Sequence, residues 1–223
     1  MGPVIGDILP LALGVAISPI PIIAAILMLL SPKAKGTSVG FLIGWLLGIV
    51  VAVVVFTLLA AVIPEQGADD SKPIGGTLKI LLGVGLLVLA LRQWRSRPGP
   101  GEEASLPKWM AAIDTMTAGR GFVLGFLLSA VNPKNLLMAA SAGLIIGTAG
   151  LSVAEVTLAI VVFVLIAGCS VALPVVAYLL ASKRMAAPLE SLRVWLVHNN
   201  ATVMAVLLLV IGVVVIGKGL GSF

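Results

Sequence analysis

Six long apolar stretches run through this 223-residue chain, and they restrict its fold more than any other feature. They cover residues 8–30, 38–63, 77–91, 121–146, 153–181 and 201–217. All but the third reach the range of about 17 to 25 residues that a transmembrane helix needs. The third is the shortest and requires Lys79 and Arg92 to extend their charged groups to the interface. With 60% hydrophobic and 10% charged residues, the chain is predicted to be an all-α membrane protein with six transmembrane helices in one domain, residues 1–223.

Basic residues are concentrated in alternate connections between these stretches. The first, third and fifth connections contain Lys33, Lys35, Arg92, Arg95, Arg97, Lys108, Arg120, Lys183, Arg184 and Arg193. The second connection is acidic, through Glu65, Asp69 and Asp70, and the fourth has no basic residue. Because cytoplasmic loops are enriched in Lys and Arg, we predict a multi-pass plasma-membrane protein with both termini outside. Lys218 near the C-terminus is a single charge against this orientation.

The composition excludes several other classes of protein. A net charge of +5 could suggest a nucleic-acid partner, but in so apolar a chain basic residues are typical of loops that face anionic lipids. Cys169 is the only cysteine and His198 the only histidine, so the sequence predicts no disulfide, redox pair or metal site. No nucleotide-binding loop and no hydrolase or protease motif occurs. We therefore expect no nucleic-acid partner, no cofactor and no enzymatic activity.

Glycines recur every four residues in two of the predicted spans. Gly40, Gly44 and Gly48 share a face of the second span, and Gly121 and Gly125 share a face of the fourth. Such faces let helix backbones approach closely in lipid, where packing rather than hydrophobicity drives association. The pattern favours packing within the bundle, with a homodimer as the alternative use of the same faces.

The connection at residues 92–120 separates the two halves of the chain and is too short to contain a soluble domain. Within it, Trp109, Met110, Ile113 and Met116 recur at near-helical spacing. This spacing predicts a short amphipathic helix in the membrane interface, immediately before the fourth span.

The first and fourth spans each contain proline near the middle of the bilayer. The residues concerned are Ser18, Pro19 and Pro21 in the first span, and Ser129, Asn132, Pro133, Lys134 and Asn135 in the fourth. A proline removes a backbone donor and frees the carbonyl four residues earlier, so both helices are predicted to kink or unwind. Each break falls in the first helix of a set of three predicted helices, and the two sets cover residues 1–91 and 121–223. Because each set has an odd number of spans, the two sets cross the membrane in opposite directions and are predicted to be inverted repeats. Paired broken helices point to a transporter's central site, because freed backbone groups and helix ends can bind a substrate there.

Lys134 lies about thirteen residues into its span, where a cation costs several kcal/mol unless it is paired or hydrated. No acidic residue lies at the same depth. The candidate partners are the side chains of Ser18, Ser129, Asn132 and Asn135 and the carbonyls freed by the prolines. We predict that Lys134 attracts an anionic headgroup or carboxylate, or changes its protonation state during transport. The alternative interpretation is a misplaced span boundary, with Lys134 in a solvated loop.

Three segments resemble a known family. They are NPKNLLMAASAG at residues 132–143, SPIP at residues 18–21 and the PKW…ID segment at residues 107–114. Together they resemble the GAP family, the peptidoglycolipid- and sulfolipid-addressing proteins of mycobacteria and other actinobacteria, within the LysE exporter superfamily. The resemblance implies a six-helix plasma-membrane protein that helps to move glycolipids toward the cell surface. The related disulfide-reductant transporters use a cysteine pair that this chain lacks, so that branch is excluded.

Three functions remain open at this point. The first is a transporter or export accessory for envelope glycolipids, with a lipid substrate, membrane lipids and lipid-synthesis or export machinery as partners, and an ion gradient or a partner as energy source. The second is a LysE-like exporter of amino acids or other small solutes. The third is a scaffold that recruits lipid-synthesis enzymes through residues 92–120, although a scaffold has little reason to hold a cation at mid-bilayer.

Overall fold

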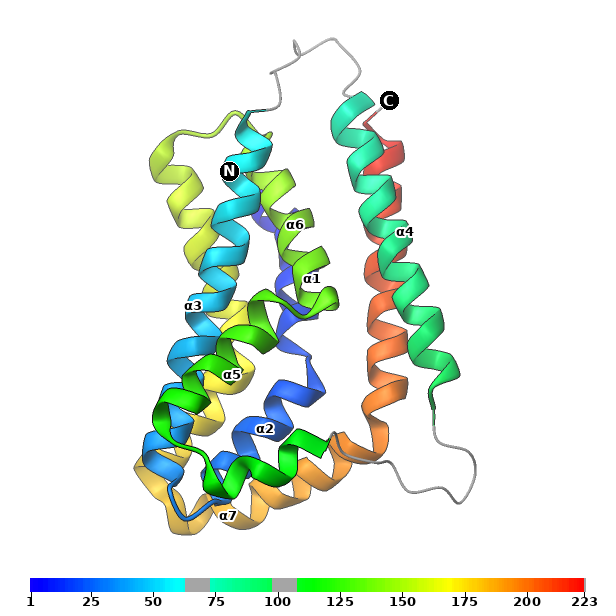
Figure 1. Ribbon diagram of the computed structural model, residues 1–223. Coiled ribbons are helices and arrows are strands. Elements are labelled where there is room, and N and C mark those ends of the chain that lie inside the picture. The colour runs from blue at the N-terminus through cyan, green and yellow to red at the C-terminus, as the bar shows by residue number, and fades with distance from the viewer. Residues whose placement is uncertain (63–72, 98–107, 223) are drawn as a thin grey trace.

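The computed structural model describes residues 1–62, 73–97 and 108–222, and the regular structure in these ranges is entirely helical (Figure 1). The elements are α1 (Gly2–Ala16), α2 (Pro19–Leu30), α3 (Ala34–Ala61), α4 (Pro73–Arg95), the 3₁₀-helix η1 (Lys108–Thr115), α5 (Ala118–Ala130), α6 (Pro133–Gly147) and α7 (Val153–Leu220). The predicted all-α class is therefore confirmed.

The first and fourth predicted spans are each built from two helices. α1 and α2 meet at a bend of 50°, and α5 and α6 at a bend of 60°. α7 has non-helical dihedral angles at Ala181, which divide it into the apolar segments Val153–Ser182 and Arg184–Leu220. The described residues thus contain four helices long and apolar enough to cross a membrane, or six spans if each bent pair counts as one. This composition is that of a multi-pass membrane protein, and the inverted repeat stays a prediction.

Two predicted boundaries were wrong for one physical reason. α4 is 23 residues long, so the third span is not short, and residues 182–200 continue as helix where a loop was expected. Hydropathy ends a span where charged residues begin, but a helix continues through Arg, Gln and Glu because their helix propensity is high. The ion pair between Glu190 and Arg193, at 2.5 Å and three residues apart, also suits a helix in this segment.

The connections lie at opposite ends of the bundle. Figure 1 shows α7 descending along one side, crossing the base of the molecule and rising beside α4. The α2–α3 connection, η1 and the middle of α7 gather at this base, which we call the basal end, and both chain termini lie at the other, the apical end (Figure 1). This grouping agrees with the predicted alternation of loops, while the side of the membrane that each end faces stays a prediction.

The second halves of the two broken spans are the most deeply buried helices. Nine of the twelve residues of α2 and eleven of the fifteen residues of α6 are buried. A helix that is apolar on every side is most stable when other elements surround it, and α2 has that composition. α6 is apolar except at Lys134, Asn135 and Ser141, which are themselves buried. The breaks at the beginning of α2 and α6 are therefore placed inside the bundle.

The predicted glycine faces pack against each other between α3 and α5. A Cβ atom at Gly44 would overlap the carbonyl oxygen of Phe122, and a Cβ atom at Gly125 would overlap that of Phe41. Neither position has room for a side chain, because the partner's backbone occupies it. The prediction of packing within the bundle is confirmed, and this contact uses both faces.

The helix expected in the membrane interface before the fourth span has a different form and place. Residues 108–115 form the 3₁₀-helix η1, and Met110 and Ile113 are buried inside the protein rather than exposed to lipid. η1 contacts α2. Met110 and Ile113 of the predicted apolar face thus pack against the bundle, while the side chain of Trp109 lies outside the described residues.

Candidate functional site

The first break leaves backbone carbonyls of α1 without their helical donors. Ser18 N–H donates to the carbonyl of Ala16 at 2.8 Å, so it is not available to the carbonyl of Gly14, its partner in a regular helix. Pro19 has no N–H for the carbonyl of Val15. The C-terminal end of α1 therefore presents partly negative oxygens inside the bundle.

The second break is closed by the two asparagines that flank it. Asn132 is the N-cap of α6, and its Oδ1 accepts a hydrogen bond from the backbone N–H of Lys134 at 3.1 Å. Pro133 follows at the first helical position, where its missing N–H costs nothing. Asn135 Nδ2 donates to the carbonyl of Leu128 in α5 at 3.0 Å, which ties the two sides of the break together.

Lys134 connects the two breaks. Its Nζ donates to the carbonyl of Gly14 at 2.5 Å, and the residue is 4% exposed. The ammonium thus replaces the missing amide at the end of α1, where the helix dipole also favours a cation. The alternative of a solvated loop at Lys134 is wrong, because the side chain is buried in the bundle and the chain there is helical.

The other predicted site residues are placed unequally around this contact. Ser18, Pro19 and Pro21 are buried at the beginning of α2, beside the break. Ser129 is directed elsewhere, because its Oγ donates to the carbonyls of Gly125 and Phe126 and lies against α3. The structure therefore brings the first break and Lys134 together and leaves Ser129 in the α3–α5 contact.

The amide of Asn135 is only half used. Its Nδ2 is bonded as described above, but Oδ1 is buried without a hydrogen-bond partner among the described residues. A buried acceptor without a donor costs about 1–3 kcal/mol, and such groups are rare in stable proteins. Oδ1 is one residue from Lys134, so the site contains both a buried cation and a vacant acceptor.

Gly14 belongs to the site although the sequence did not single it out. A Cβ atom there would lie 2.6 Å from Sδ of Met138 and would also overlap the Cδ1 atom of Ile211. Met138 is one turn after Lys134 on α6, so a glycine at this point lets α1 approach close enough for the lysine to reach its carbonyl. No local pattern marked Gly14, because its partners are far away in the sequence.

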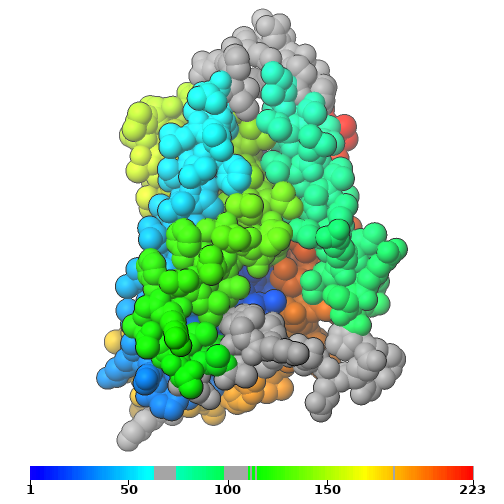
Figure 2. Space-filling view, in the orientation of Figure 1, coloured from blue at the N-terminus to red at the C-terminus, as the bar shows by residue number. Residues whose placement is uncertain are grey.

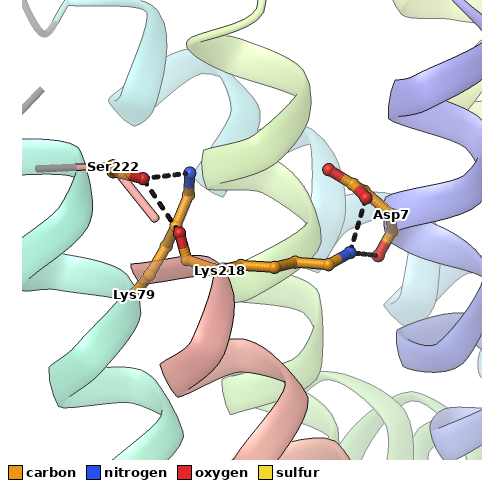
Figure 3. A network of polar contacts seen from close by, with 4 residues as sticks. All are labelled: Asp7, Lys79, Lys218 and Ser222. Carbon is orange, nitrogen blue, oxygen red and sulfur yellow. Dashed lines mark hydrogen bonds and ion pairs between the residues drawn. The ribbon is translucent and has the colours of Figure 1, made fainter. Parts of the chain in front are cut away.

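A second polar network lies at the apical end, between α1, α4 and α7 (Figure 3). Lys218 Nζ is 2.7 Å from Asp7 Oδ1 and also donates to the Asp7 carbonyl. Lys79 Nζ donates to Ser222 Oγ at 3.3 Å, and Ser222 donates to the carbonyl of Lys218. No local pattern in the sequence marks this network, because Asp7 and Lys218 are 211 residues apart.

The surface is hollowed on the side shown in Figure 2. The hollow lies between α4 and α5, and dark blue atoms of the N-terminal helices and orange atoms of α7 are visible at its floor. The central elements of the bundle are therefore visible from this side of the molecule.

A bundle of apolar helices with two broken spans and a buried lysine between them defines a multi-pass membrane protein with a polar centre. The family model of Sap, sulfolipid-1-addressing protein (SfLAP), matches residues 8–221, and the chain belongs to this family. No curated protein and no solved structure matches the chain. The resemblance to sulfolipid-addressing proteins is thus confirmed, while membership of the LysE superfamily stays a prediction.

Proposed function

We propose that this protein takes part in the export of an anionic envelope lipid or glycolipid, as the transporter or as an accessory of one, through the site between the two broken helices. The observation that carries the proposal is the buried ammonium of Lys134 on the carbonyl of Gly14, with no ion pair to Lys134 among the described residues. The family supports the class of cargo, because it is named for addressing a sulfolipid.

The present partner of Lys134 can be replaced by a stronger one. The end of a helix offers about half an elementary charge, whereas a sulfate, phosphate or carboxylate group offers a full one. Charge-assisted hydrogen bonds are also about twice as strong as neutral ones. Lys134 is the second residue of α6, so the positive end of that helix adds to the attraction for an anion.

The two bends give the transport step a structural basis. In this proposal residues 1–91 and 121–223 are inverted repeats, and their relative rocking exposes the site to each side of the membrane in turn. The similar bends of 50° and 60° support this arrangement. In the same proposal, a lipid tail reaches the centre laterally through the hollow in Figure 2. An ion gradient or a partner supplies the energy.

The proposal is tested by comparing Lys134→Met with Lys134→Arg in a host strain that lacks the native gene. We expect Lys134→Met to abolish surface delivery of the sulfolipid and Lys134→Arg, which keeps the charge, to retain part of it. The protein should still fold, because two effects on stability oppose each other: Lys134→Met leaves the Gly14 carbonyl without its donor, but it also removes the cost of burying an unpaired cation. Surface-extractable lipid is measured beside the amount of protein in the membrane.

Each outcome of this comparison separates the alternatives. Undiminished surface lipid with folded Lys134→Met protein would overturn the proposal and leave the scaffold function. Normal surface lipid together with a loss of amino-acid efflux would favour the solute exporter. Both variants could also lose surface lipid because less protein reaches the membrane. Thermal unfolding of the purified proteins distinguishes this case, since the proposal requires Lys134→Met to unfold near the wild-type temperature.

A further inference from the structure

An open cavity of about 630 Å³ lies at the basal end, far from Lys134. It is formed by the α2–α3 connection, the beginning of α5 and the middle of α7. The breaks lie at the other ends of α2 and α5, so the twelve residues of α2, about 18 Å of helix, separate the two places. We call this space the basal cavity, and its volume is in the range of about 300–1,000 Å³ that small-molecule sites occupy.

The charged residues that line the basal cavity in the described part of the chain are both lysines. Lys33 and Lys35 line it, are exposed, and form no ion pair with a described residue. None of the described residues that line it is acidic. The first turn of α3, which also lines it, has no side-chain cap, so its backbone N–H groups add to the positive potential. The cavity therefore favours an anion.

Hydroxyl groups surround the same space. Thr117, Tyr178 and Ser182 line it from α5 and α7, and Tyr178 is half-buried there. Hydroxyls donate to the oxygen atoms of phosphate and sulfate esters, and lysine supplies the charge that such groups require. Ser31 and Thr37 also line the cavity, but their hydroxyls donate to the carbonyls of Met28 and Lys33. Two cations and the other three hydroxyls match the many oxygens of an ester anion better than they match a single carboxylate.

The wall of the molecule beside the cavity is apolar. Val39 lies one turn after Lys35 on α3, and Val123 lies in the second turn of α5, and both are exposed. A ligand whose charged end occupied the cavity could therefore lay an acyl chain along these helices. A free anion would gain nothing from this surface, whereas an amphiphile would.

We propose that the basal cavity binds the phosphate or sulfate ester headgroup of an anionic lipid, which is held there before it moves to the central site. The residues that line the cavity support the binding step by themselves. Only the later movement of the lipid to the central site depends on the proposed function. In the predicted orientation the basal end faces the cytoplasm, so the lipid would come from the cytoplasmic leaflet.

The test is native mass spectrometry of the full chain in a nonionic detergent, with phosphatidylglycerol, phosphatidylcholine and inorganic sulfate as separate probes. The variant is Lys33→Gln with Lys35→Gln. Its matched control is Arg92→Gln with Arg95→Gln, which removes two exposed basic residues at the basal end of α4. We expect the wild type and the control to retain phosphatidylglycerol over phosphatidylcholine, and the lysine variant to bind it about thirtyfold more weakly.

Three results would overturn the proposal. An equal loss in both double variants would show diffuse attraction to the basal end, and unchanged binding in Tyr178→Phe would place the headgroup outside the cavity. Displacement of the lipid by equimolar inorganic sulfate would show a site for a free anion. Lys134→Met should leave lipid binding intact, so a failure here is distinct from a failure of the central site.

Discussion

The two broken spans satisfy equivalent carbonyls in different ways. Gly14 lies five residues before Pro19, and Leu128 lies five residues before Pro133. In the second span, Asn135 from the same span donates to the Leu128 carbonyl. In the first, the donor to Gly14 is Lys134, 120 residues away. The Leu128 carbonyl is therefore satisfied within its own span, whereas the Gly14 carbonyl depends on the other span.

This difference follows from the residues after each proline. Asn135 stands two residues after Pro133, and the corresponding residue in the first span is Pro21, which has no side-chain donor. Lys134 corresponds to Ile20, which is apolar. If Lys134 moves to a ligand, α6 keeps its cap on Asn132, but α1 loses the donor to its last turn. The comparison assigns the rigid role to the α5–α6 break and the adjustable role to the α1–α2 break.

Asn135→Ala is expected to have the largest effect on stability. It removes the donor to the Leu128 carbonyl inside the bundle, which costs about 1–3 kcal/mol, and it leaves a cavity where the buried amide packed. These two costs should outweigh the gain from removing the unpaired Oδ1. The matched control is Asn199→Ala, which removes a similar bond to the Trp195 carbonyl on the protein surface and should change stability by less than about 0.5 kcal/mol. Unfolding of the purified proteins in mixed detergent micelles measures both. Equal losses of stability in the two variants would show that the bond from Asn135 to the Leu128 carbonyl does not stabilise the second break.

A smaller difference is expected between Asn132→Ala and Ser18→Ala. Both residues are N-caps after a break, but only Asn132 forms a side-chain cap, so its loss should cost about 1 kcal/mol. Ser18 forms no such cap, so Ser18→Ala should change the free energy of unfolding by less than about 0.5 kcal/mol. The same unfolding measurement compares them. A larger loss of stability in Ser18→Ala than in Asn132→Ala would indicate that the α1–α2 break is the rigid one.

The sequence could predict the features that depend on neighbouring residues. Both breaks were found because proline removes a specific hydrogen bond wherever it stands in a helix. The glycine faces of α3 and α5 were found because their spacing is helical. The burial of Lys134 followed from its apolar flanks.

Contacts between distant residues could not be predicted in this way. The bond from Lys134 to Gly14 and the ion pair of Asp7 with Lys218 join residues 120 and 211 apart, and no local pattern encodes them. Sequence also could not decide which surface would cover the apolar side of η1, since lipid and α2 are equally apolar. These misses concern the relative placement of helices, which depends on the whole bundle.

The smallest effect is expected at Gly14, where the two breaks meet. Alanine stabilises a helix by about 0.5–1 kcal/mol relative to glycine, and Gly6→Ala should show this gain because nothing lies within 4 Å of its added Cβ. At Gly14 the added Cβ displaces Met138 and Ile211. These are the ends of flexible side chains, so the cost should roughly cancel the gain and leave the free energy of unfolding within about 1 kcal/mol of wild type.

Gly14→Ala should nevertheless shift Met138, one turn after Lys134, and so disturb the contact of the lysine with the Gly14 carbonyl. If the adjustable first break matters for delivery, surface lipid should fall in Gly14→Ala and stay normal in Gly6→Ala, although both proteins are stable. Full delivery by Gly14→Ala would mean that the contact between Lys134 and the end of α1 need not be close, and the functional difference between the two breaks would then be lost.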